Sequence, residues 1–165
     1  MNKLSKLTIV VLLLLFAQAN VFAQDDEVTD EELTAYATLL LQIDSMKVAA
    51  KTQFSEMVKT HELMDGGRRY NALKKAIGDE AKLAEIEATE EEIAAYEGLV
   101  AKNGEASANI KTFLSTNVKE GIGAKKYNII KKKLKADADL KTKYDEIVAA
   151  LKEKMEGDAA EETNE

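Results

Sequence analysis

Apolar residues recur along residues 29–60 in alternating steps of three and four, which places them on one side of an α-helix. A helix over this span has about 30 residues and a length of roughly 45 Å. Residues 89–120 repeat the pattern, with Asn103 and Ser107 at two positions of the stripe. We expect a continuous helix there as well, although Asn103 and Gly104 form a dipeptide that is typical of turns. The expected stripe residues are Leu33, Tyr36, Leu40, Ile43, Ala50, Phe54 and Met57 in the first helix, and Ile93, Tyr96, Val100, Ile110 and Leu114 in the second, with Phe54 and Leu114 buried at equivalent places.

Each expected long helix begins with a threonine that is followed three residues later by a glutamate. The pairs are Thr29 with Glu32 and Thr89 with Glu92. This spacing is typical of a capping box, in which the two side chains satisfy backbone N–H groups at a helix start. Glycines suited to helix ends follow each long helix, at positions 66, 67, 121 and 123.

Two shorter helices are expected after each long one. The first of them starts near Arg68 in one half of the chain and near Lys125 in the other. Asp79 and Asp137 are placed to cap the next helix in each half. The short basic helices carry one apolar face each, formed by Tyr70, Leu73 and Ile77 in one and by Tyr127, Ile130 and Leu134 in the other.

The two halves also match in sequence. The stretch "TDEELTAYATLL" at 29–40 aligns with "TEEEIAAYEGLV" at 89–100, and "RRYNALKK" at 68–75 aligns with "KKYNIIKK" at 125–132. We interpret residues 29–88 and 89–155 as tandem helical units, each with a long helix, a turn and two shorter helices. Neither unit can bury its apolar stripe alone, so we predict an all-α fold in which the units pack as a helical bundle about a pseudo-two-fold axis.

Composition agrees with this fold class. The chain contains no proline, and alanine, leucine, lysine and glutamate, which favour helices, dominate it. Runs of β-branched residues with a period of two are absent from the sequence. The last residues, 156–165, are acidic and are expected to form a disordered tail.

The N-terminus indicates export. Lys3 and Lys6 precede the apolar run "LTIVVLLLLFA", which is too short to span a bilayer, and small residues then lead to Ala23. We predict a Sec-type signal peptide over residues 1–23, cleaved after Ala23, and a short leader over residues 24–28. No cysteine is present, so the chain is not expected to be a lipoprotein. The mature protein is expected to be periplasmic or secreted, in the envelope of a bacterium, and to have no membrane span.

The segment "KKYNIIKKKLKADADLKTKYDEIV" is similar to the C-terminal motif of the bacterial domain-of-unknown-function family 4168. The matching residues are Tyr127, Asn128, Asp137 and Leu140. A weaker match in the first unit consists of Tyr70, Asn71, Asp79 and Leu83, so the resemblance covers the mature chain as two tandem copies. Members of this family often have proline after the aspartate, where this chain has Glu80 and Ala138. The resemblance implies an exported helical protein and no assigned activity.

Few residues are suited to catalysis or metal binding. His61 is the one histidine, and it has no counterpart in the second unit, whereas a metal site needs three or four converging ligands. Ser55 and Ser115 lie inside the long helices, where a small polar residue usually serves packing. Paired glutamates such as Glu91 and Glu92 lie at a helix start, where they stabilise the helix dipole. We therefore expect no enzyme activity, no cofactor and no bound metal.

Charge is distributed unevenly along this acidic chain, whose formal net charge is −7. Residues 119–143 are rich in lysine, and residues 79–105 are rich in acids. Basic residues recur at matched places in the two units, and helical spacing predicts that they form a ridge facing water. The ridge comprises Arg68, Arg69, Lys74, Lys75, Lys125, Lys126, Lys131 and Lys132. Such runs are usually solvated faces, and the functional interpretation is contact with a phosphorylated or acidic envelope polymer, with lipid head groups or with the acidic face of a protein partner.

Two classes of function follow from these features. The favoured one is a non-catalytic bundle protein that binds a protein or an anionic polymer. The alternative is small-ligand binding or hydrolysis in a cleft between the units, with Tyr36, Tyr96, Asn103 and Ser107 as its residues. Nucleic acid is not expected as a partner, because the chain is exported and acidic and has no aromatic residues interleaved with its lysines.

Overall fold

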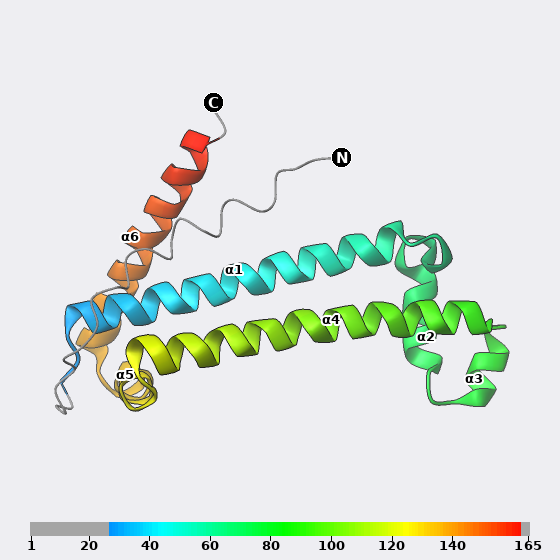
Figure 1. The fold of residues 1–165 in the computed structure, drawn as a ribbon, viewed down its shortest axis with the longest axis horizontal. Coiled ribbons are helices and arrows are strands. Elements are labelled where there is room, and N and C mark those ends of the chain that lie inside the picture. Colours follow the sequence, from blue (N-terminus) through cyan, green and yellow to red (C-terminus); the bar gives the residue numbers. More distant parts are fainter. Residues whose placement is uncertain (1–26, 163–165) are drawn as a thin grey trace.

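A computed structural model describes residues 27–162 of the chain, with side chains up to Met155. Within this range the chain forms six α-helices and no strand, which confirms the all-α prediction (Figure 1). The helices are α1 (Asp30–Thr60), α2 (Arg68–Ala76), α3 (Glu80–Glu85), α4 (Glu90–Asn117), α5 (Ala124–Ala136) and α6 (Ala138–Glu162), with a 3₁₀ turn at Glu62–Gly67 and a π-helical turn at Val118–Ile122. The predicted signal peptide and most of the leader lie outside the described residues.

The two long helices, α1 and α4, run antiparallel and side by side, and the shorter helices gather at the two ends of this pair (Figure 1). Helix α2 packs against α4 at one end. Helices α5 and α6 pack against α1 at the other end. The last turns of α6 point away from the long pair (Figure 1). The helical bundle is therefore elongated, with its short helices at opposite ends.

Both long helices begin as the sequence predicted. Thr29 and Glu32 form a complete capping box at the start of α1, and Thr89 and Glu92 form one at the start of α4. Helix α4 is continuous through Asn103 and Gly104, as expected. Both residues are exposed on this helix, although the dipeptide is typical of turns.

Two hydrophobic clusters stabilise the bundle, one at each end of the long pair. In the first, Leu33, Tyr36 and Ile43 of α1 meet Ile130 of α5. In the second, Val58, Met64 and Leu73 meet Leu99 of α4. Each cluster also contains a matched tyrosine contact, with ring centroids 5.1 Å apart between Tyr36 and Tyr127 and 5.1 Å apart between Tyr70 and Tyr96. Both clusters draw on residues from before and after Ala88, so burial depends on contact between the two predicted units.

The predicted stripe is wrong by one residue on α4. Leu99 is buried with 4% of its surface exposed, whereas Val100 is 42% exposed. Leu39, the residue at the matching place on α1, is likewise buried. Phe54 and Leu114 are only half-buried. The apolar positions three and four residues apart predicted the correct side of each long helix. Contacts with the neighbouring helices decide which residues on that side are buried.

The third helices differ from the prediction in length. Helix α3 has only 6 residues, whereas α6 has 25 and is nearly as long as α4. Helix α6 continues to Glu162, so residues 156–162, expected to be a disordered tail, are helical. Alanine and glutamate in this segment favour a helix, and proline is absent from it.

Candidate functional site

The eight basic residues of the predicted ridge divide into two groups in the structure. Six of them are exposed to water, namely Arg68, Lys74 and Lys75 on α2 and Lys125, Lys131 and Lys132 on α5. Arg69 and Lys126 are instead turned inward and form ion pairs with the capping glutamates of the long helices. For these two residues the prediction of a solvated ridge is wrong.

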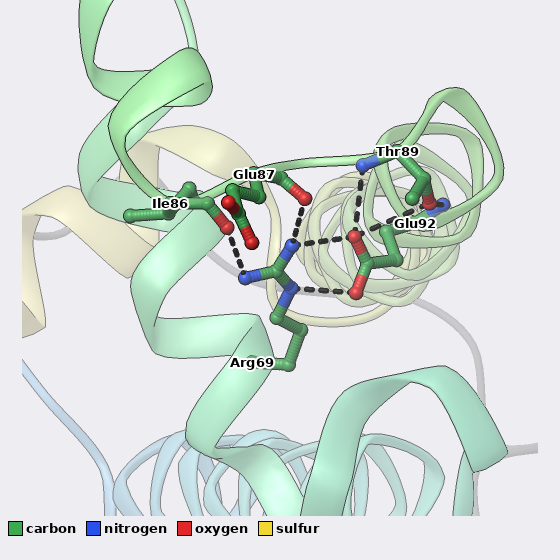
Figure 2. A network of polar contacts seen from close by, with 5 residues as sticks. All are labelled: Arg69, Ile86, Glu87, Thr89 and Glu92. Atoms are coloured by element: carbon green, nitrogen blue, oxygen red, sulfur yellow. Dashed lines mark hydrogen bonds and ion pairs between the residues drawn. The ribbon is translucent and has the colours of Figure 1, made fainter.

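Arg69 connects α2 to the start of α4 (Figure 2). Its Nε donates to Oε1 of Glu92 and its Nη2 donates to Oε2, each at 2.6 Å. The same guanidinium group donates to the backbone oxygens of Ile86 and Glu87, at 2.8 and 3.0 Å. Such a two-pronged contact is the strong geometry for arginine and carboxylate. Arg69 therefore holds the link between α3 and α4 as well as the capping box.

The carboxylate of Glu92 both pairs with Arg69 and caps the start of α4. It accepts the bonds from Arg69, and its Oε2 also accepts from the backbone N–H of Thr89 at 2.9 Å. Hydrogen bonds from Arg69, and then from Thr89, lower the pKa of Glu92 to about 2. The carboxylate therefore stays charged in any mildly acidic medium.

Lys126 occupies the equivalent place at the other end of the bundle. Its Nζ lies 3.0 Å from Oε1 of Glu32, and it donates to the backbone oxygen of Glu27 at 2.8 Å. The side chains of Lys126 and Glu32 are only 9% and 3% exposed. Glu32 also accepts from the backbone N–H of Thr29. Buried charges such as these require partners, so this contact is structural.

Arg69 and Lys126 were wrongly predicted to be exposed because each directly follows a basic residue that is exposed. Each belongs to a pair of adjacent basic residues, and neighbouring residues on a helix point about 100° apart. The first member of each pair, Arg68 or Lys125, faces water, whereas the second faces the other long helix. The recurrence of a basic pair in both halves could have indicated a structural ion pair. An ion pair that is present in both halves leaves the same sequence pattern as a basic surface that is present in both.

The exposed side of α5 forms a dense basic surface, which we call the lysine face and define as Lys125, Lys131, Lys132 and Lys135. Lys135 lies on the same side of the helix but was not among the predicted ridge residues. Helix α5 contains no acidic residue, and these four lysines form no ion pair with any residue from 27 to 155. Asn128 lies among them and donates from its side chain to the backbone oxygen of Ala124. Among the residues whose side chains the structure describes, the lysine face therefore carries positive charge that no ion pair neutralises.

The matching side of α2 is weaker. Arg68 forms an exposed ion pair with Asp65, at 3.0 Å between Nε and Oδ2. Lys74 and Lys75 are exposed, and they have no lysine counterpart to Lys135 nearby on this shorter helix. The two halves of the predicted ridge are thus unequal, and α5 carries the stronger surface.

The residues proposed for a cleft do not come together. Tyr36 lies in the cluster at one end of the long pair, and Tyr96 lies in the cluster at the other end. Asn103 lines a shallow groove between α1 and α4, together with Gln53 of α1. The hydroxyl of Ser107 is exposed and donates to the backbone oxygen of Asn103. The structure therefore offers no site that unites the four residues.

His61 ends α1 and caps the 3₁₀ turn that follows, where its Nδ1 accepts from the backbone N–H of Leu63 at 3.3 Å. Within the part of the chain that the structure describes, no three histidine, aspartate or glutamate side chains are grouped so as to hold a metal ion. Over the same residues, no helix combines the length and the apolar character needed to cross a membrane.

The fold and this surface define a class, an all-α helical bundle with a lysine-rich helix at one end. A scan against protein-family models found no match, and searches of curated proteins and of solved structures found none either. The resemblance to family 4168 stays a prediction from the quoted motif.

Proposed function

We propose that this chain is an exported, non-catalytic helical bundle protein of the bacterial envelope that binds an anionic polymer or an acidic protein through the lysine face of α5. The observation that carries the proposal is a set of four exposed lysines on one side of a helix that contains no acid. The chain as a whole is acidic, with a net charge of −7, whereas this surface is positively charged.

The spacing of the lysines favours a polymer with repeated charges. Lys125 and Lys132 are seven residues apart, which is about 10 Å along a helix, and the other two lysines lie beside and beyond them. Neighbouring lysines of the face are closer than this: Lys132 and Lys135 are about 4.5 Å apart along the helix, which is within the screening length of about 8 Å at physiological salt, so they act together on a partner. A single small anion would touch one or two of the lysines, whereas a flexible polyanion can contact all four.

Export is supported by the sequence. The charged start, the apolar run and the small residues before Gln24 are typical of a signal peptide. An exported protein meets anionic envelope polymers as potential partners, and it does not meet the nucleic acids of the cytoplasm. The resemblance to family 4168 implies the same location.

The test compares two variants that remove equal charge. One carries Lys125→Gln, Lys131→Gln, Lys132→Gln and Lys135→Gln, and the control carries four changes to glutamine at exposed lysines elsewhere: Lys51, Lys111, Lys152 and Lys154. Lys126 is left intact in both, because it belongs to the structural ion pair. Binding is measured by co-sedimentation with native envelope fractions and by titration with a long-chain polyphosphate, at low and at high salt.

We expect the wild type and the control to bind at low salt and to release at high salt, and the lysine-face variant to bind at least tenfold more weakly. Thermal melts of both variants should match the wild type, because exposed charges contribute little to stability. Equal binding by the two variants would exclude the lysine face as the binding surface. Binding to envelope fractions that is lost after protease treatment of those fractions would indicate an acidic protein as the partner.

A further inference from the structure

Both hydrophobic clusters combine contacts within a unit with contacts that run to the other unit. Helix α2, which follows α1 in the chain, packs against α4. Helices α5 and α6, which follow α4, pack against α1. Each set of short helices therefore covers the long helix of the opposite half, an arrangement expected when two copies of one unit dimerise and exchange elements.

The charged contacts follow the same rule. Arg69 pairs with Glu92 across the two units, and Lys126 pairs with Glu32 in the opposite direction. Lys143 of α6 forms a further cross-unit pair, with Asp30 of α1. Each unit thus presents a surface that is complementary to the other in shape and in charge, and this complementarity does not depend on which chain supplies the other unit.

The only covalent connection between the units is a short hinge, residues 86–89, between α3 and α4. Glu87 in this hinge has φ of 50°, a left-handed conformation that residues with a side chain adopt at an energetic cost. Arg69 offsets that cost by donating to the backbone oxygens of Ile86 and Glu87. The closed hinge therefore contains one residue in an unfavourable conformation, which is held by Arg69 and by backbone bonds from the N–H of Glu87 to the oxygen of Ala84 and from the N–H of Ala88 to the oxygen of Leu83.

We propose that two copies of this chain can exchange units, so that residues 27–88 of one copy pack against residues 89–155 of the other and the hinge is extended. Every cross-unit contact described above is reproduced in such a dimer, and the left-handed conformation at Glu87 is no longer required. Short, strained hinges favour this kind of exchange, whereas a relaxed hinge favours the closed monomer. The partner that fits the buried face of each unit is thus a second copy of this chain.

The first experiment changes the hinge alone. Proline fixes φ near −65°, so Glu87→Pro cannot adopt the closed conformation and also loses the bond from its N–H to the oxygen of Ala84. Glycine adopts φ of 50° readily, so Glu87→Gly is the matched control. Each full-length mature chain is unfolded in urea and refolded at high concentration. Its molar mass is then measured by light scattering after gel filtration. We expect Glu87→Pro to be a dimer with wild-type helical content and Glu87→Gly to be a monomer.

The second experiment keeps the wild-type hinge and reverses one ion pair. Arg69→Glu places two acids together in its own monomer, and Glu92→Arg places two arginines together in its own. In a mixed exchanged dimer, the introduced carboxylate at position 69 of one chain would meet the introduced guanidinium at position 92 of the other, and the remaining pair would be the original arginine and glutamate. We expect the two variants, refolded together, to give a one-to-one heterodimer in mass spectrometry with one chain isotopically labelled. Either variant refolded alone should give no dimer, because both of its 69–92 pairs would carry like charges.

A folded, monomeric Glu87→Pro protein would overturn the proposal. If Glu87→Pro does not fold, the mixed refolding decides: a heterodimer supports exchange, and two separate monomers or two unfolded chains refute it. Neither readout involves the lysine face, so the result is independent of polymer binding.

Discussion

Arg69 of α2 and Glu92 of α4 are joined by two hydrogen bonds of 2.6 Å, and Glu92 is also the capping residue of the long helix. The equivalent residues at the other end of the bundle, Lys126 and Glu32, form the same kind of contact at 3.0 Å. In both places a basic residue on a short helix neutralises the carboxylate that caps the opposite long helix. This relationship fixes how the two halves of the chain meet, and its consequences can be measured.

The first prediction concerns pH and Glu92. Its pKa is about 2 in the folded chain and near 4.5 in the unfolded chain, so the folded state holds the charged form more favourably. The resulting stabilisation is complete above pH 4.5 and is lost as the pH falls through 2, because the unfolded state binds the proton first. Glu92→Gln should therefore be less stable than the wild type at about pH 6, and the difference should shrink between pH 4.5 and 2. Urea melts across this range are the measurement, and a difference that is independent of pH would contradict the assignment.

The second prediction concerns the buried pair of Lys126 and Glu32. Lys126→Met leaves the carboxylate of Glu32 buried without its partner and should reduce the free energy of unfolding by about 3–5 kcal/mol. Adding Glu32→Gln removes the charge yet keeps an acceptor for the N–H of Thr29, so the double variant should recover most of that loss. Lys131→Met on the exposed side of the same helix is the control, with an expected change of about 0.5 kcal/mol or less. If denaturant melts give the single variant a higher free energy of unfolding than the double variant, the structural role of the Lys126–Glu32 pair is refuted.

The third prediction tests which side of α4 is buried. Leu99 is 4% exposed and Val100 is 42% exposed. Leu99→Ala should reduce the free energy of unfolding by about 2–5 kcal/mol, because it opens a cavity beside Met64 and Leu73. Val100→Ala removes fewer buried atoms and should cost about 1 kcal/mol or less. Similar losses for both variants would mean that the helix is rotated relative to the structure described.

The fourth prediction concerns processing. If the chain is exported as proposed, the protein recovered from its native host should begin at Gln24, because Ala23 closes the one well-placed cleavage site in the sequence. Intact-mass analysis of the purified protein gives the answer directly. A mature form that retains residues 1–23 would contradict the export part of the proposal, while leaving the lysine face to be judged by its own binding test.

The sequence by itself determined the local structure. Thr29, Glu32, Thr89 and Glu92 marked the starts of the two long helices, and the structure forms both capping boxes. Such contacts involve residues three positions apart, so spacing along the chain is sufficient to specify them. The same holds for Asp79, which accepts from the N–H of Lys82 at the start of α3. The all-α class followed from periodicity and from the absence of proline, which are also local properties.

Only the tertiary structure decided which residues of each helix are covered. Lys125 and Lys126 are chemically identical neighbours, yet one is exposed and the other is buried against Glu32. Leu99 and Val100 are comparable apolar neighbours, and the structure buries only the first. A step of one residue turns a side chain by about 100° around the helix, and the pattern along a single helix cannot say where the edge of the neighbouring helix falls. That edge is set by contacts between residues far apart in the chain, such as Lys126 and Glu32, and it separates the structural basic residues from the exposed lysine face.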